Sequence, residues 1–168
     1  GGGGSTPADG LFAWDGVAWT TMERTDPWPQ PRTHHAMAFD PLRGALVVFG
    51  GEDGAVTPLA DTWTFDGAVW SAGPSGPSAR RGAALCFDET RGDTLLFGGT
   101  GASGVQPADW WTLDAAGWVD RTGPDAEAPA GREGHSMTWD ARRGAVVMGY
   151  GRLMGTALSD QFEWDGAH

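Results

Sequence analysis

Short apolar segments recur along the chain between polar, glycine-rich connections, and this pattern indicates β-strands. Val, Phe, Trp and Thr, which favour strands, are frequent in the segments. The nearly continuous apolar run 45–49 predicts a strand that is buried on both faces. Asp-Gly pairs at 15–16 and 66–67 predict two-residue hairpin turns, because such turns need positive φ. The hydrophobic pattern therefore predicts an all-β protein built from hairpins.

One pattern of residues occurs three times in register. Each unit has an arginine that is followed, eight positions later, by an aspartate next to an aromatic residue. The three arginine–aspartate pairs are Arg32/Asp40, Arg80/Asp88 and Arg132/Asp140. An Arg-Gly pair, an apolar run and a glycine-rich motif follow in each unit, and then an Asp-x-aromatic motif. The glycine-rich motif is Phe-Gly-Gly at 49–51 and 97–99, and Gly-Tyr-Gly at 149–151.

The later part of the unit repeats as well. The Asp-x-aromatic motif lies at 61–63, 109–111 and 160–162, and Trp70 and Trp118 close the two complete units. Residues 12–19 match only this last part. The pattern resembles the kelch repeat, in particular tryptophan-rich bacterial kelch proteins and the central domain of galactose oxidase. The resemblance implies that each unit of about 50 residues is one four-stranded propeller blade.

We therefore expect an all-β fold of kelch-type β-propeller blades, about three per chain. The resemblance divides the chain into a glycine-rich linker or loop, a partial blade, two complete blades and a second partial blade. These segments are 1–10, 11–27, 28–75, 76–123 and 124–168. Strand counting by analogy gives two, four, four and three strands, or 13 in all.

Thirteen strands are too few for a closed ring, because a propeller needs at least about four blades. Two explanations stay open. Two copies pair as a homodimer that completes a six-bladed ring, or the chain is a fragment of a longer propeller. An open arc would expose apolar blade faces, which favours association. The chain ends at His168, one residue before the position that matches Trp118, which suits a cut chain.

Composition narrows the class of partner. The formal net charge of −11 disfavours binding to nucleic acids and to acidic membrane surfaces. No apolar run approaches the length of a membrane-spanning helix. The single cysteine, Cys86, excludes an intrachain disulfide but does not fix the compartment. The absence of Lys, Asn and Ile fits a GC-rich bacterial genome.

The segments that lead into the innermost strands carry the candidate ligand-binding residues. In eukaryotic kelch adaptors, arginines at the matching position bind acidic peptides, which implies such a role for Arg32, Arg80 and Arg132, with Arg81 beside them. Guanidinium groups around a channel could hold carboxylates in bidentate fashion. The alternative is that these arginines brace the loops between blades.

Histidines and two tryptophans complete the candidate set. His34, His35 and His135 lie near the same segments, but Ala83 replaces the histidine in the second full unit. We therefore expect no metal site, and favour a structural hydrogen bond for the histidines. Trp28 and Trp110 break the repeat, and so are the candidate surfaces for stacking of a sugar or peptide.

Other repeated residues are expected to be structural. Four tryptophans should fill the space between blades: Trp63, Trp70, Trp111 and Trp118. The aspartates at the Asp-x-x-Arg-Gly turns should accept hydrogen bonds from the turn and form solvated ion pairs on the opposite face of the disc. These are Asp40, Asp88 and Asp140.

We expect a non-enzymatic binding or scaffold propeller that closes by self-association and presents its Arg/His loops to an acidic peptide, small ligand or protein partner. No cofactor is expected, because the Cys–Tyr crosslink, second Tyr and two His of galactose oxidase cannot be assembled from one Cys and one Tyr. The alternatives are an enzyme with a channel pocket at a subunit interface, acting on a small molecule or carbohydrate, and a purely structural module.

Overall fold

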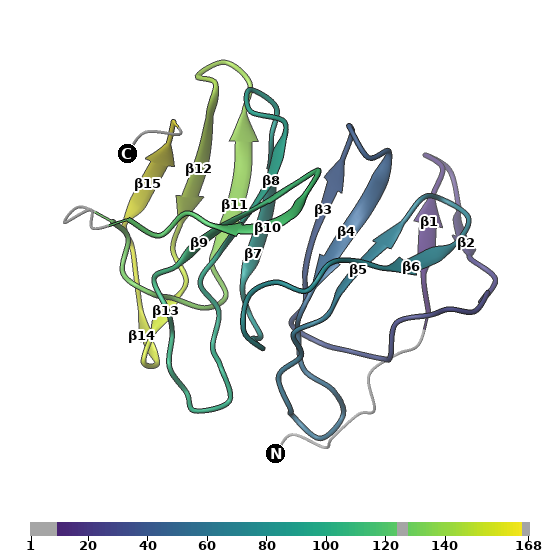
Figure 1. Cartoon of the computed structure of the whole chain (residues 1–168), viewed down its shortest axis with the longest axis horizontal. Helices are drawn as coiled ribbons and strands as arrows, with labels where there is room; N and C mark the ends of the chain where they lie inside the picture. The colour runs from purple at the N-terminus through teal and green to yellow at the C-terminus, as the bar shows by residue number, and fades with distance from the viewer. Residues whose placement is uncertain (1–9, 124–127, 166–168) are drawn as a thin grey trace.

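The computed structural model describes residues 10–123 and 128–165. This part of the chain contains fifteen β-strands and no helix (Figure 1). The predicted linker at 1–10 lies outside the described residues except for Gly10. The all-β prediction is confirmed, and no sheet among the described strands closes into a ring.

Two complete blades form the middle of the chain. Each is an antiparallel sheet whose four strands follow one another in chain order. The strands of blade 1 are β3 (Ala36–Asp40), β4 (Ala45–Phe49), β5 (Thr62–Phe65) and β6 (Trp70–Ala72). Those of blade 2 are β7 (Ala84–Asp88), β8 (Asp93–Phe97), β9 (Trp110–Asp114) and β10 (Gly117–Asp120).

Incomplete sheets flank these blades. Blade 3 has three strands, β11 (Ser136–Asp140), β12 (Ala145–Gly149) and β15 (Gln161–Trp164). The separate N-terminal hairpin consists of β1 (Phe12–Trp14) and β2 (Trp19–Thr21). These strands account for the predicted 13. The sequence did not predict a further small hairpin, β13 (Arg152–Leu153) and β14 (Thr156–Ala157), in the loop between β12 and β15.

The blades lie side by side through their first strands. β3, β7 and β11 are neighbours and define the inner side of an arc, while the later strands of each blade point outward (Figure 1). The segments before these first strands and the β13–β14 hairpin lie at one end of the arc, the lower end in Figure 1. We call this end the channel mouth.

Each blade junction contains its own hydrophobic core. Val47 and Phe49 of β4 pack with Leu96 of β8 between blades 1 and 2. The alternate residues of β8, Leu95 and Phe97, face the other way and pack against blade 3. A strand between two blades must be apolar on both faces, which explains its continuous hydrophobic sequence.

The four repeated tryptophans make different contacts. Trp118 packs against Phe49 with ring centroids 5.4 Å apart, so a residue of blade 2 contacts blade 1. Trp70 is buried between Phe65 and Trp28. The indoles of the two remaining residues donate hydrogen bonds to aspartates two positions earlier, Trp63 to Asp61 and Trp111 to Asp109.

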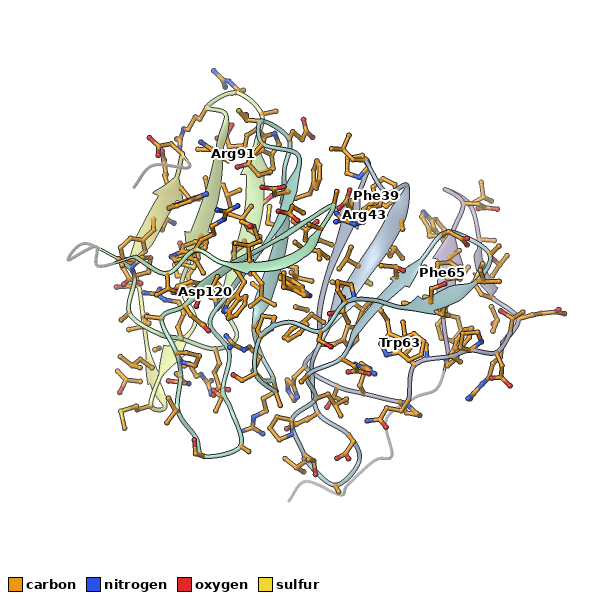
Figure 2. All side chains as sticks on the ribbon, in the orientation of Figure 1. Phe39, Arg43, Trp63, Phe65, Arg91 and Asp120 are labelled. Carbon is orange, nitrogen blue, oxygen red and sulfur yellow. The ribbon has the colours of Figure 1, made fainter. Side chains whose placement is uncertain are left out.

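The turns at the opposite end differ from the expectation of solvated ion pairs. Arg43 and Arg91 lie at that end, the upper end in Figure 2. The side chains of Asp40 and Asp88 are completely buried, and each accepts two turn amides and the guanidinium of its arginine. In the Asp140–Arg143 pair, by contrast, the aspartate is partly exposed as well as the arginine. Burial follows because the neighbouring blade covers the turn, as when Thr94 of β8 donates to Asp40.

Candidate binding site at the channel mouth

The repeated arginines Arg32, Arg80 and Arg132 each tie three segments of one unit together. The guanidinium of Arg80 makes a bidentate ion pair with Asp109, at 2.6 and 2.8 Å, and donates to the Gly98 carbonyl at 3.0 Å. Its remaining donors reach the Ser78 carbonyl and hydroxyl. All five N–H groups of Arg80 are therefore used within the blade. Arg32 pairs in the same way with Asp61, and Arg132 with Asp160.

These pairs keep the aspartates ionised. Burial alone would raise the pKa of Asp109, but hydrogen bonds from Arg80 and Trp111 hold that pKa below its usual value. The pKa of Asp61 is lowered by the same balance. In the third unit the hydrogen bond from Arg132 lowers the pKa of Asp160, and the Arg132 guanidinium lies over the Phe162 ring.

This placement favours the bracing alternative for the repeated arginines over ligand binding. The side chains of Arg80 and Arg132 are 2% and 0% exposed, and that of Arg32 is 5% exposed. Their donors are directed at loops of their own blades, so the geometry favours the bracing role. The sequence could not decide this, because the partner aspartate lies about 29 residues away and meets the arginine only after the blade has folded.

The two candidate stacking tryptophans are engaged in packing. Trp110 is buried, 4.5 Å from Phe97 and stacked on Trp164 at 5.4 Å between ring centroids. This burial favours packing over ligand stacking for Trp110. Trp28 is half-buried, lies edge-on to Trp70 and carries the Arg24 guanidinium 5.8 Å from its ring centroid.

The three histidines occupy different environments. His135 is buried at the blade 2–3 junction, and neither ring nitrogen has a hydrogen-bond partner among the described residues. The expected structural hydrogen bond is therefore wrong for His135. Burial, and then the charge of Arg132, lower the pKa of His135 to about 4, so the ring is neutral. His35 is exposed, and His34 lies at the channel mouth with Nδ1 3.0 Å from Glu52.

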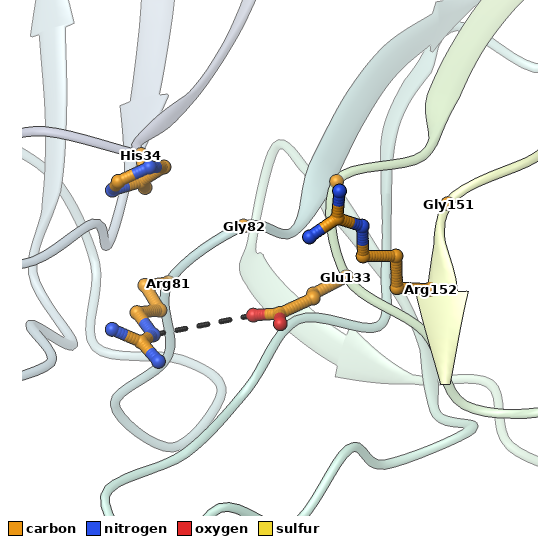
Figure 3. Close-up of a pocket in the computed structure, with 7 residues that line it drawn as sticks. His34, Arg81, Gly82, Glu133, Gly151 and Arg152 are labelled. Atoms are coloured by element: carbon orange, nitrogen blue, oxygen red, sulfur yellow. Dashed lines mark ion pairs between the residues drawn. The ribbon is translucent and has the colours of Figure 1, made fainter. Parts of the chain in front are cut away.

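A cavity of about 560 Å³ opens at the channel mouth (Figure 3). All three units contribute to it, through the segments before β3, β7 and β11 and the β13–β14 hairpin. Its lining is His34, Arg81, Gly82, Glu133, Gly134, Gly151 and Arg152. Of the predicted ligand-binding residues, the structure brings His34 and Arg81 together here.

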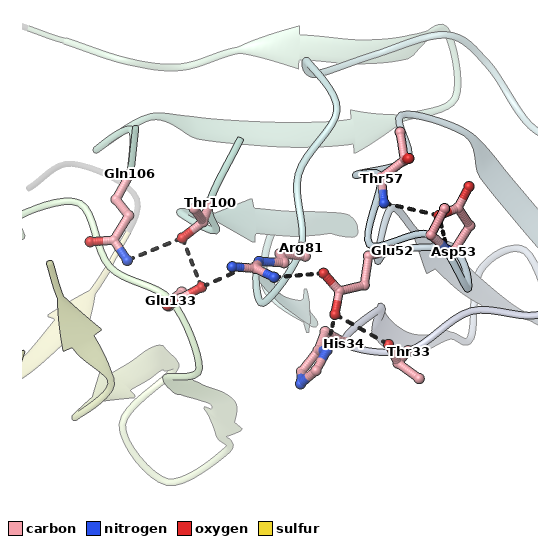
Figure 4. Close-up of polar contacts among 10 residues, drawn as sticks. Thr33, His34, Glu52, Asp53, Thr57, Arg81, Thr100, Gln106 and Glu133 are labelled. Carbon is pink, nitrogen blue, oxygen red and sulfur yellow. Dashed lines mark hydrogen bonds and ion pairs between the residues drawn. The ribbon is translucent and has the colours of Figure 1, made fainter. Parts of the chain in front are cut away.

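A chain of polar contacts joins the three units around this cavity (Figure 4). Arg81 of the second unit donates to Glu52 of the first at 2.7 Å, and its Nε lies 4.0 Å from Glu133 of the third. Thr100 donates to Glu133 at 2.8 Å. Burial would raise the pKa of Glu52, but Arg81 and His34 lower it.

Backbone bonds follow the same path. Gly82 N–H donates to the His34 carbonyl, and Gly134 N–H donates to the Gly82 carbonyl, both at 2.8 Å. All three residues have φ between 54° and 65°, the left-handed conformation. The inner rim of the mouth is therefore a repeated backbone feature that supports variable side chains.

Sequence reasoning missed Glu52, Glu133 and Arg152 as site residues. Each occupies a position that differs in every unit: Thr33, Arg81 and Glu133 are equivalent, as are Glu52, Thr100 and Arg152. The sequence did carry a signal for these residues: the residue type at these two positions changes from unit to unit, while the neighbouring arginine and glycines repeat. Arg152 is exposed, and its guanidinium has no hydrogen-bond or ion-pair partner in the described part of the chain.

Within 10–123 and 128–165, no group of three His, Cys, Asp or Glu side chains is close enough to hold a metal ion. Cys86 lies within β7, whereas Tyr150 follows β12 of another blade.

The comparison with protein families agrees with this architecture. Residues 3–165 match the KLHDC2/KLHL20/DRC7 Kelch-repeats domain. The chain belongs to the kelch-repeat family. The kelch fold explains the repeated blade, its inner first strand and its variable loops at the channel mouth. A search of curated proteins found no match. No helix in the described residues is long and apolar enough to cross a membrane.

Proposed function

We propose that this kelch protein is a non-enzymatic binding module whose channel-mouth cavity takes a ligand with carboxylate groups, such as an acidic peptide. The unpartnered guanidinium of Arg152 at the cavity is the observation that carries this proposal. A guanidinium in a partly enclosed site matches a carboxylate in both charge and shape.

The charges around the cavity support the choice of an anion. Arg81 and Arg152 present two guanidinium groups, while the two nearby carboxylates are already engaged. Glu52 accepts from Arg81 and lies against His34, and Glu133 accepts from Thr100. The two guanidinium groups and the two carboxylates balance in charge, so in a chain with a net charge of −11 the mouth is close to neutral, and Arg152 is the cation there that can attract an anionic group at short range.

Fluorescence polarisation with a labelled peptide of consecutive glutamates tests the proposal, with the glutamine version as the uncharged probe. Arg152→Gln should weaken binding of the acidic peptide by about tenfold, corresponding to about 1.4 kcal/mol for a charge-assisted bond. Arg142→Gln is the matched control, because Arg142 is also exposed but lies at the turn after β11 at the other end. Equal binding by both variants, or equal binding of both peptides, contradicts the proposal.

Self-association is the second part of this proposal, and exposed aromatic side chains support it. Trp14 and Trp19 of the N-terminal hairpin are 51% and 68% exposed, and Phe39 of β3 is 56% exposed. Aromatic surface of this extent favours burial against a second copy. Sedimentation velocity at micromolar concentration should show a dimer, and Trp19→Ser should shift it towards monomer. A wild-type monomer over the whole concentration range contradicts this part.

A further inference from the structure

Blades in this chain join through close contacts at the first glycine of the Phe-Gly-Gly motif. A Cβ atom on Gly50 would lie 2.5 Å from the carbonyl oxygen of Arg80 in the next unit. A Cβ atom on Gly98 would likewise lie 2.5 Å from the Arg132 carbonyl oxygen. Both values are far below van der Waals contact, so this junction requires glycine.

The second glycine of the motif completes the junction. Gly51 N–H donates to the Arg80 carbonyl at 2.9 Å, and Gly99 N–H donates to the Arg132 carbonyl at 2.8 Å. The next unit's arginine carbonyl is thus fixed directly beside the first glycine at both junctions. Two independent junctions with the same distances define one standard docking register.

Tyr150 occupies the position of the first glycine in the third unit. The conserved geometry identifies it: Arg132 donates to its carbonyl at 3.0 Å, as Arg80 does to that of Gly98. The φ of Tyr150 is 64°, against 62° and 65° for Gly50 and Gly98. A tyrosine has therefore been placed in a left-handed conformation that glycine adopts without cost.

The backbone of Tyr150 is held in place. Its N–H donates to the Asp160 carbonyl at 3.1 Å, and its hydroxyl accepts from Gln161 Nε2 at 3.0 Å. Its Cβ atom therefore stays where the arginine carbonyl of an incoming unit would lie. Gly151 N–H, the donor that would bind this carbonyl, has no backbone acceptor among the described residues.

We propose that Tyr150 is a steric stop that prevents any further kelch unit, including a second copy of this chain, from docking on blade 3 in the standard register. The outer face of blade 3 accepts only a partner that keeps its backbone away from Gly151 N–H. A six-bladed ring of two copies joined by six equivalent steps is thereby excluded. This inference concerns where a second copy binds, and it holds whether or not the channel mouth binds an anion.

A pair of variants that differ by one methyl group tests the stop. Tyr150→Gly removes the Cβ atom and opens the register, whereas Tyr150→Ala removes the ring but keeps the Cβ atom. Sedimentation velocity should show at least tenfold tighter self-association for Tyr150→Gly than for wild type, and no change for Tyr150→Ala. Equal association of the glycine and alanine variants overturns the proposal, whereas the wild-type mass alone decides the separate proposal of dimer formation.

Thermal unfolding of three variants provides the controls. Both Tyr150 variants should unfold cooperatively at or above the wild-type temperature, which separates new association from aggregation of unfolded chains. Gly98→Ala places a Cβ atom against the Arg132 carbonyl and should lower the melting temperature by several degrees. If Gly98→Ala is as stable as wild type, the register does not need glycine and the stop at Tyr150 is overturned.

Discussion

Trp118 donates a hydrogen bond from its indole nitrogen to the Thr62 hydroxyl, 2.9 Å away across the junction between blades 1 and 2. The same ring packs edge-on against Phe49, so one side chain supplies both apolar and polar contact between the blades. Trp70, which closes the preceding unit, is buried without a partner for its indole nitrogen among the described residues. The two tryptophans therefore offer a comparison of packing with and without a hydrogen bond.

Trp118→Ala and Trp70→Ala should each lower the free energy of unfolding by roughly 3–5 kcal/mol, because each empties an aromatic contact in a core. The phenylalanine variants distinguish the two sites. Trp118→Phe leaves the Thr62 hydroxyl without its donor and should cost about 1 kcal/mol more than Trp70→Phe, which removes an unpaired N–H. Urea unfolding followed by circular dichroism measures these differences. If the two phenylalanine variants lose the same free energy of unfolding, the Trp118–Thr62 hydrogen bond does not stabilise the protein.

Arg80→Met should destabilise the protein by roughly 3 kcal/mol or more, because Asp109 loses its bidentate partner in a largely buried site. The pH dependence of stability should change as well. The lowered pKa of Asp109 means that its contribution is present above about pH 4, near the pKa of a free carboxyl, and is lost as pH falls further through the lowered pKa. In Arg80→Met this acid loss should be smaller. Unfolding measured between pH 2 and pH 5 checks both expectations, and an unchanged acid limb would contradict them.

Asp40→Ala should cost about 3 kcal/mol, whereas Asp140→Ala should cost about 1 kcal/mol. Both remove a carboxylate that accepts turn amides, but Asp40 is buried, and its loss leaves amide donors and Arg43 without that acceptor inside the protein. Water can replace the Asp140 carboxylate, because its side chain is partly exposed to solvent. Paired thermal melts of the two variants provide the test. Similar melting temperatures would show that burial does not decide the cost.

Acidification should destabilise the protein through His135. Its pKa of about 4 in the folded state lies below the ordinary value of 6.5, so between these pH values the unfolded chain binds a proton that the folded protein does not. Stability should be unaffected by this group above pH 6.5, and should fall by up to about 3 kcal/mol as pH decreases to 4. His135→Ala, which copies the Ala83 of the second unit, should flatten this slope. His35→Ala should also flatten the slope, because burial and then the charge of Arg32 lower the pKa of His35 as well.

The blade architecture was predictable because each strand carries its own local signal and the signal repeats. Runs such as 45–49 are apolar on both faces because they lie between two blades. The Asp-Gly pairs mark two hairpins correctly, but the predicted two-residue turns are wrong: the loops span 15–18 and 66–69, the glycine alone of each pair has positive φ, and the aspartate accepts turn amides. The β13–β14 hairpin was not predictable, since it consists of two-residue strands around Met154 and Gly155 without an apolar pattern.

The candidate site was predicted only in part, because identical residue types serve different purposes in the folded protein. The sequence placed Arg32, Arg80 and Arg132 at the correct end of each blade but could not show that Asp61, Asp109 and Asp160 return to them. The sequence singled out Arg81, which stands next to a repeated arginine, but not Arg152, which occupies a variable position. Arg81 is not a bracing arginine, because it pairs with Glu52 of another unit and not with an aspartate of its own unit.

Cys86 lies on the innermost strand of blade 2, within the core that joins blades 2 and 3. Burial, and then the charge of Asp88, raise the pKa of its thiol to about 11, so almost no reactive thiolate exists at neutral pH. Because it is the only sulfhydryl in the chain, alkylation of the native protein can occur only when this core opens. The rate of iodoacetamide labelling, measured by mass spectrometry, therefore reports how often the two blades separate.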